Sequence, residues 1–186
     1  MKYGIFGGSF NPIHNGHIII MQLSIEYLKL DRLFVIPAYQ PPHKRTETLA
    51  PFEKRYRWVI DCLKEFQEIE VNDYERKKGG LSYTIDTIEH FIKMMGERPY
   101  LIIGEDMAKM FHKWYKYEEI IAKSQVCVYP RYRVSPELSF KEKFLMMDLP
   151  LIQISSSDVR KRLKTGKSVK GFVPDSIIEE LMEVYS

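Results

Sequence analysis

Cysteine is scarce in this sequence. The 186 residues include two, Cys62 and Cys127, which lie far apart and each inside an apolar stretch. A disulfide framework or a cysteine-rich metal site needs more thiols at closer spacing. We therefore expect both side chains to be buried free thiols in a protein of a reducing compartment.

A strong charge imbalance and a long apolar run are also missing. The 28 basic and 25 acidic residues give a net charge of +3, without the dense positive stripe of a protein that grips a nucleic-acid backbone. No segment approaches the roughly 18 apolar residues of a membrane span, and Met1 to Gly4 lead into a turn instead of an apolar signal-like stretch. We expect a cytoplasmic protein with neither a nucleic-acid nor a membrane partner.

The pattern of apolar residues predicts the fold. Short runs rich in β-branched and aromatic residues predict strands at 3–6, 33–36, 69–71, 100–103, 126–129 and 151–154. Between them, helical periodicity predicts amphipathic helices, for example at 18–28, 56–63 and 85–92. This alternation favours an α/β fold with a doubly wound, mostly parallel sheet and ligands at the carboxyl ends of its strands.

At 186 residues and 45% apolar content, the chain is expected to form a single domain over residues 1–186. The segments 37–51, 74–81 and 130–139 have the most irregular patterns. Because the first two follow predicted strands, we expect them to be substrate loops.

The first predicted strand runs into a glycine-rich loop, residues 7–17, that contains two histidines. Its glycines allow backbone N–H groups to approach a phosphate, and the helix that Asn15 or a neighbour would cap adds a positive dipole end. His14 and His17, three residues apart in the first helical turn, can both reach one anionic centre, which suits a phosphoryl group under attack. The alternatives are a glycine turn with incidental histidines, or half of a zinc site, for which His43, His90 and His112 supply no suitable spacing.

Two further segments follow predicted strands. Ser155 with Asp158 is typical of a capping box, and the same helix start offers hydroxyls, amides and the Arg160 guanidinium to a polyphosphate. Asp106, which follows Gly104, could accept hydrogen bonds from ribose hydroxyls or could be a plain helix-start acid.

These segments together resemble the bacterial nicotinate-nucleotide adenylyltransferases, within the nucleotidyltransferase superfamily marked by a histidine-x-glycine-histidine motif. The resemblance covers nearly the whole chain. Its segments are residues 7–17, 41–44, 82–87, 104–106, 114–115 and 154–160. The Ser-Tyr-Thr sequence at 82–84 and the Trp-Tyr pair at 114–115 indicate the nicotinate branch.

The resemblance implies a Rossmann-like fold and adenylyl transfer from ATP to nicotinate mononucleotide, which yields deamido-NAD and pyrophosphate in NAD biosynthesis. The implied catalytic residues are His14, His17 and Arg160. The implied ATP-binding residues are Gly8, Ser9, Phe10, Lys44, Gly104, Asp106, Ile154, Ser155 and Ser156, and those for nicotinate are Thr84, Trp114 and Tyr115. Mg²⁺ is expected to arrive with ATP, because the sequence has no dense carboxylate cluster that could cage it.

The sequence departs from the family pattern at two points. Ser157 stands where a threonine is commoner, which keeps a hydroxyl. Pro130-Arg131 stands where relatives often have arginine before proline, so Arg131 is given no role.

Three other functions share some of these features. A pantetheine-phosphate adenylyltransferase or a cytidylyltransferase would explain the histidine loop but not the segments at 82–84 and 114–115. A nucleotide-binding regulator without catalysis would not need the histidines and Arg160. A nucleic-acid-binding module would share the histidine motif with transfer-RNA synthetases, but the chain has no room for an anticodon domain and its charge is balanced. The sequence leaves open whether the chain forms a homo-oligomer.

Overall fold

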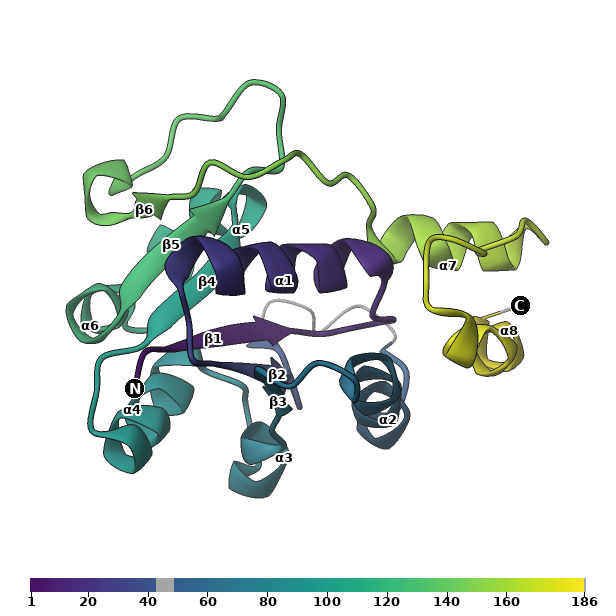
Figure 1. The fold of residues 1–186 in the computed structure, drawn as a ribbon, viewed down its shortest axis with the longest axis horizontal. Helices are drawn as coiled ribbons and strands as arrows, with labels where there is room; N and C mark the ends of the chain where they lie inside the picture. The colour runs from purple at the N-terminus through teal and green to yellow at the C-terminus, as the bar shows by residue number, and fades with distance from the viewer. Residues whose placement is uncertain (43–48, 186) are drawn as a thin grey trace.

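A computed structural model describes residues 1–42 and 49–185. Within these residues the strands form one six-stranded sheet in the order β3-β2-β1-β4-β5-β6, with every pair of neighbours parallel (Figure 1). The strands are β1 (Tyr3–Gly8), β2 (Arg32–Pro37), β3 (Ile69–Val71), β4 (Tyr100–Gly104), β5 (Gln125–Tyr129) and β6 (Leu145–Met146).

The strand order confirms the doubly wound, Rossmann-like architecture. From β1 the chain adds β2 and β3 on one side, then returns to place β4, β5 and β6 on the other. The order therefore reverses between β1 and β4, and ligands of such sheets bind outside the carboxyl ends of the strands at this switch point.

The helices lie between and after the strands. They are α1 (Asn15–Leu28), α2 (Phe52–Leu63), α3 (Tyr74–Lys78), α4 (Thr84–Met95), α5 (Glu105–Lys109), α6 (Tyr117–Lys123), α7 (Ser156–Lys164) and α8 (Ile178–Tyr185), with short 3₁₀ turns η2 (Phe111–Lys113), η3 (Lys141–Lys143) and η4 (Asp175–Ile177). Figure 1 shows α7, in yellow-green, and α8, in yellow, beyond the carboxyl end of β1.

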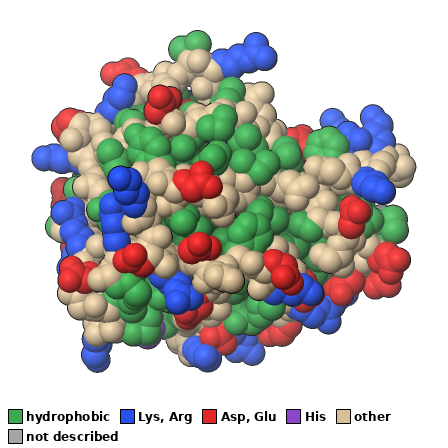
Figure 2. Space-filling view, viewed as in Figure 1, with side chains coloured by type: hydrophobic (Ala, Val, Ile, Leu, Met, Phe, Trp, Pro, Cys, Tyr) green, Lys and Arg blue, Asp and Glu red, His purple; other side chains and the backbone are tan. Residues whose placement is uncertain are grey.

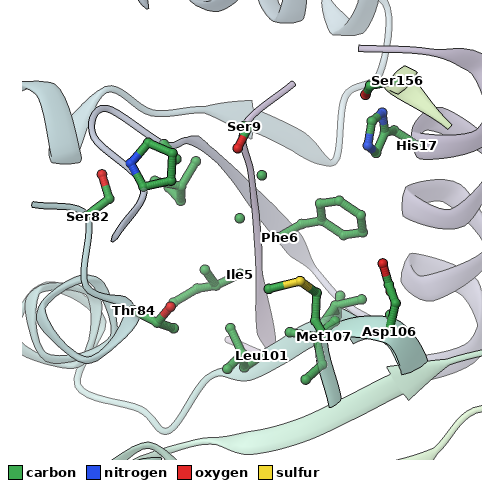
Figure 3. A pocket seen from close by; sticks show the side chains of 18 of the residues that line it. Ile5, Phe6, Ser9, His17, Ser82, Thr84, Leu101, Asp106, Met107 and Ser156 are labelled. Atoms are coloured by element: carbon green, nitrogen blue, oxygen red, sulfur yellow. The ribbon is translucent and has the colours of Figure 1, made fainter. Parts of the chain in front are cut away.

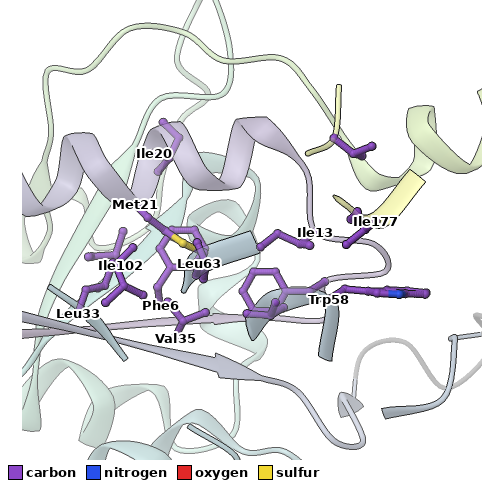
Figure 4. Packing of buried hydrophobic residues seen from close by; sticks show 14 of the residues in the cluster. Phe6, Ile13, Ile20, Met21, Leu33, Val35, Trp58, Leu63, Ile102 and Ile177 are labelled. Carbon is purple, nitrogen blue, oxygen red and sulfur yellow. The ribbon is translucent and has the colours of Figure 1, made fainter. Parts of the chain in front are cut away.

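Alternating strand residues supply two cores, one on each face of the sheet. Phe6 of β1 packs with residues of α1, α2 and α8, whereas the neighbouring Ile5 packs with residues of α4 and α6. Figure 4 shows the first core, in which Trp58 and Ile177 extend the packing toward the C-terminal segment.

The prediction of a strand at 151–154 is wrong. The sixth strand is Leu145–Met146, paired with Cys127 and Val128, while residues 151–154 follow it without regular structure. The carbonyl oxygens of Ile152 and Ile154 accept hydrogen bonds from the Arg131 guanidinium instead of from a neighbouring strand. An apolar β-branched run therefore satisfies its backbone through a side chain.

The interpretation of 74–81 as irregular is also wrong in part, because Tyr74–Lys78 form α3. This helix has five residues, and Glu75 alone among them is buried. A helix this short and this polar lacks the apolar periodicity that reveals longer amphipathic helices.

Both thiols are free. Cys127 is buried in β5 and Cys62 is half-buried on α2, so the expectation of burial is confirmed for Cys127 and partly for Cys62. Burial raises the pKa of each thiol to about 12.

The exterior mixes both signs of charge. In Figure 2, Lys and Arg side chains are interspersed with Asp and Glu over the visible face. Among the described residues, the helices are too short or too polar to cross a membrane.

Candidate active site

The histidine loop leads from the carboxyl end of β1 into α1. His14 is the N-cap residue of α1, and its Nδ1 accepts a hydrogen bond from the backbone N–H of His17 at 3.3 Å. In return, Nδ1 of His17 accepts from the backbone N–H of His14 at 3.2 Å. The two histidines thus form a reciprocal capping box in which imidazoles replace the usual hydroxyl and carboxylate.

This capping box determines the tautomer of both rings. A neutral imidazole carries one hydrogen, and each Nδ1 acts as an acceptor, so the hydrogen of each ring lies on Nε2. The rings stack with centroids 3.6 Å apart and planes 19° apart, and both line the same cavity.

His14 is neutral over the physiological range. Burial lowers its pKa to about 3, and the positive charge of Arg131 acts in the same direction. The ring is therefore a hydrogen-bond donor and not a cation or a proton carrier near pH 7.

Gly16 allows the histidine stack to form. A Cβ atom at this position would lie 3.0 Å from Nδ1 of His14 and 3.2 Å from Cγ2 of Ile152. A larger residue would push against the ring that caps the helix, which explains a glycine between the two histidines.

The N-terminus of α7 is docked on the same loop. Oγ of Ser156 donates to the carbonyl of Pro12 at 2.8 Å, and Nη1 of Arg160 donates to the carbonyl of Asn11 at 2.6 Å. Ser155 caps α7 by accepting from the N–H of Asp158 at 3.1 Å. Ser155 is therefore confirmed as the N-cap of α7, whereas the Asp158 carboxylate accepts from the Ser155 hydroxyl and not from the backbone N–H that a full capping box uses. The same helix start lies beside the histidines.

Arg131 also lines the cavity, although the sequence reasoning gave it no role. Its backbone N–H donates to Oε2 of Glu105 at 2.7 Å, and its guanidinium bonds the carbonyl of Ile152 at 2.9 Å. Its place just after the carboxyl end of β5 was the signal that could have marked it.

The other end of the cavity is aromatic. Thr84 begins α4, whose N-cap residue Tyr83 makes no side-chain capping bond. The rings of Tyr83 and Tyr115 have centroids 4.6 Å apart. Trp114 is half-buried, with its ring centroid 5.0 Å from that of Phe111.

Between the two ends lies the switch point of the sheet. Gly8 and Gly104, the last residues of β1 and β4, line this part of the cavity together with Ser9 and Asp106, which follow these strands. A Cβ at Gly104 would lie 2.5 Å from Oδ1 of Asp106, so glycine is required for the carboxylate to take its position.

All of these groups surround one cavity of about 380 Å³. In Figure 3, His17 and Ser156 lie toward one end, Ser82 and Thr84 lie toward the other, and the apolar side chains of Ile5, Phe6 and Leu101 lie between them. The sequence-predicted site residues that line it are Gly8, Ser9, His14, His17, Thr84, Gly104, Asp106, Trp114, Tyr115, Ser155, Ser156 and Arg160.

Two of the predicted residues that the structure describes, Phe10 and Ile154, do not line this cavity. The side chain of Phe10 is buried below the loop, stacked on Phe6 and packed against the edge of His17. Ile154 is half-buried in the core on the α1 side, and its carbonyl accepts from Arg131. Lys44 lies outside the described residues, as does His43.

The described residues contain no group of three or more His, Cys, Asp or Glu side chains able to hold a metal ion. The polar groups near the histidines are instead hydroxyls, imidazoles and guanidinium groups. Such a donor set recognises an anion.

Paired imidazoles and a docked helix N-terminus at the switch point of a parallel sheet define the cytidylyltransferase-like class of nucleotidyltransferases. The family model for cytidylyltransferase-like proteins matches residues 5–162. A relative from Thermotoga petrophila, named as a probable nicotinate-nucleotide adenylyltransferase, is 45% identical and covers 99% of this chain and 96% of its own. A relative from Clostridium tetani with the same name is 36% identical over 94% of this chain and 92% of its own.

The chain belongs to the nicotinate-nucleotide adenylyltransferase family. Its fold is also that of the Plasmodium falciparum nicotinic acid mononucleotide adenylyltransferase solved with NaAD, with a TM-score of 0.83 and 18% identity over 98% of this chain and 95% of that one.

Proposed function

We propose that the chain transfers the adenylyl group of ATP to nicotinate mononucleotide, giving nicotinate adenine dinucleotide (deamido-NAD) and pyrophosphate, a step of NAD biosynthesis. The observation that carries this proposal is a single cavity with anion donors at one end and the Thr84, Trp114 and Tyr115 cluster at the other. The two ends fit the triphosphate and the pyridine of the two substrates.

The histidine pair is assigned to the α-phosphate of ATP. An oxygen of the acceptor phosphate attacks the α-phosphorus in line, and the bond to the bridging oxygen breaks as pyrophosphate leaves with the bonding electrons. Nε2–H groups of His14 and His17 stabilise the negative charge on the α-phosphate oxygens during this step. The acceptor phosphate is already ionised near pH 7, so no general base is required.

The start of α7 is assigned to the leaving group. Ser155, Ser156 and Arg160 would bind the β- and γ-phosphates, because amides at a helix N-terminus and a guanidinium both favour phosphate oxygens. Lys44 is proposed for the same phosphates by resemblance to the family.

The nucleoside is assigned to the middle of the cavity. Gly8 and Ser9 would line the nucleotide, and Gly104 and Asp106 would meet the adenosine, where the exposed carboxylate can accept from ribose hydroxyls. Phe10 would support the loop from below through its packing on His17, and Ile154 would act through its backbone beside Ser155.

The nicotinate is assigned to the aromatic end. Thr84 is the first residue of the 12-residue helix α4, whose positive dipole end favours a carboxylate. We place the nicotinate carboxylate at the backbone N–H groups of Thr84 and Tyr115, and the pyridine ring on Trp114.

Magnesium is expected to enter on the triphosphate, whose charge it partly neutralises. The described lining has two carboxylates, Glu75 and Asp106, which are too few for a protein cage. The two free thiols suit a reducing compartment, so we place the activity in the cytoplasm.

Pyrophosphate release from ATP tests this function. The chain is assayed with nicotinate mononucleotide, nicotinamide mononucleotide and phosphopantetheine at matched concentrations, and the highest kcat/KM is expected for nicotinate mononucleotide. A higher value for phosphopantetheine, or release that does not depend on the acceptor, would overturn the assignment.

A further inference from the structure

Glu75 on α3 is a buried carboxyl group at the cavity wall that none of the assigned roles uses. It is 7% exposed and lines the cavity on the side of Ser82 and Thr84. A carboxyl group costs free energy to bury unless hydrogen bonds compensate it, so its partners indicate its purpose.

Three donors converge on this carboxyl group. Oγ1 of Thr87 donates to Oε1 at 3.2 Å, and the backbone N–H of Tyr39 donates to Oε2 at 3.3 Å. The hydroxyl of Ser82 supplies the third hydrogen bond. Burial raises the pKa of Glu75, and the three donors act against this rise.

Ser82 extends the network to a second loop. Its Oγ accepts from the backbone N–H groups of Tyr39 at 2.9 Å and Gln40 at 3.0 Å, and its own N–H donates to the carbonyl of Gln40 at 3.0 Å. The Tyr39 N–H is shared between this oxygen and Oε2 of Glu75. Because Oγ of Ser82 accepts from both backbone N–H groups, its own hydrogen is directed to Glu75.

The network therefore joins two walls of the cavity. Tyr39 and Gln40 belong to the loop that follows β2, whereas Ser82 and Thr87 flank the start of α4. Thr84 lies between Ser82 and Thr87, so the carboxyl group holds both sides of the turn that presents the Thr84 N–H. Both carboxyl oxygens already accept hydrogen bonds from these residues, so we do not assign the group a role as a base.

We propose that Glu75 is a positioning residue for the acceptor, which fixes the 82–87 turn against the loop after β2 so that the nicotinate end of the cavity is preformed. This inference rests on the proposed nicotinate site. It concerns binding of the acceptor and not the chemical step or ATP.

The variant E75Q tests it. Gln keeps the size of the side chain, but its NH₂ group must face one of the three donors. We expect KM for nicotinate mononucleotide to rise about tenfold or more, since a buried donor loses its acceptor. KM for ATP and kcat should stay within about twofold, because the histidine end is untouched. The exposed Glu70 of β3 provides the matched control E70Q, expected to match the wild type.

The variant S82A provides a second test that leaves the carboxyl group in place. It should also raise KM for the acceptor selectively. Residues of one network are not additive, so the double variant E75Q/S82A should lose less than the product of the two single effects. Melting temperatures are recorded for every variant.

Two results would overturn the proposal. One is an equal rise in KM for both substrates, or a lower kcat with an unchanged acceptor KM, in a folded E75Q protein. The other is multiplicative loss in the double variant. A wild-type enzyme that uses nicotinate and nicotinamide mononucleotides equally would instead refute the nicotinate site itself, and this outcome is read from the wild type alone.

Discussion

Replacement of His17 separates the two tasks that the structure gives to this side chain. Its Nδ1 accepts a hydrogen bond from the backbone N–H of His14, the second half of the capping box of α1, and its Nε2–H is assigned to the α-phosphate. His17→Ala removes both groups. His17→Asn keeps an acceptor oxygen near the position of Nδ1 and removes Nε2, so it should retain the hydrogen bond from the His14 N–H and lose the phosphate donor.

The two variants should differ in stability and agree in activity. Loss of the hydrogen bond from the His14 N–H costs about 1 kcal/mol, which corresponds to a fall in melting temperature of roughly 2–4 °C for a protein of this size. This fall is expected for His17→Ala and not for His17→Asn. Loss of a charge-stabilising donor costs about 2.7–4 kcal/mol, so both variants should lose roughly a hundredfold to a thousandfold in kcat.

Pyrophosphate release at saturating substrates, beside thermal melting, measures both quantities. A His17→Asn protein that melts like the wild type and keeps kcat within about threefold would refute the assignment of Nε2 to the transition state. A His17→Ala protein that melts like the wild type would refute the acceptor role of Nδ1, and with it the tautomer deduced from the capping box.

Four further predictions concern the same cavity. Arg160→Ala should raise KM for ATP more than KM for the acceptor, because the guanidinium is assigned to the leaving phosphates. Unchanged ATP kinetics with a large fall in melting temperature would show that Arg160 has only a structural role, through its hydrogen bond to the Asn11 carbonyl. Nicotinate mononucleotide should exceed nicotinamide mononucleotide about tenfold to a hundredfold in kcat/KM, since a carboxamide leaves a buried donor unpaired at about 1–3 kcal/mol. Trp114→Ala should reduce use of the acceptor more than use of ATP; because Trp114 also packs against the core, a loss of stability of several kcal/mol with balanced kinetics would assign it to packing. The pKa of His14 falls from its ordinary 6.5 to about 3 on folding, so the unfolded state binds more protons between these values and the free energy of unfolding should fall as pH drops below about 6.5; urea titrations at pH 7 and 5 measure this, and His14→Asn should show a shallower decline.

The local sequence determined most strands and the histidine site. Runs such as 100–103 alternate or cluster apolar residues over a few positions, and this pattern depends only on neighbours along the chain. The same holds for His14 and His17, whose spacing within one helical turn places both rings together once α1 begins.

The tertiary structure decided which distant groups meet. Residues 151–154 have the composition of a strand, but two of their carbonyl oxygens accept hydrogen bonds from the guanidinium of Arg131, about 20 positions earlier in the chain. In the sequence, Glu75 is one acidic residue of a polar segment. Only the packing of α3 against the 82–87 turn buries its carboxyl group among three hydrogen-bond donors. Hydrogen bonds between side chains and distant backbone groups depend on how the strands and helices pack. They leave no periodic signal in a single sequence, so the tertiary structure revealed them and the pattern of apolar residues did not.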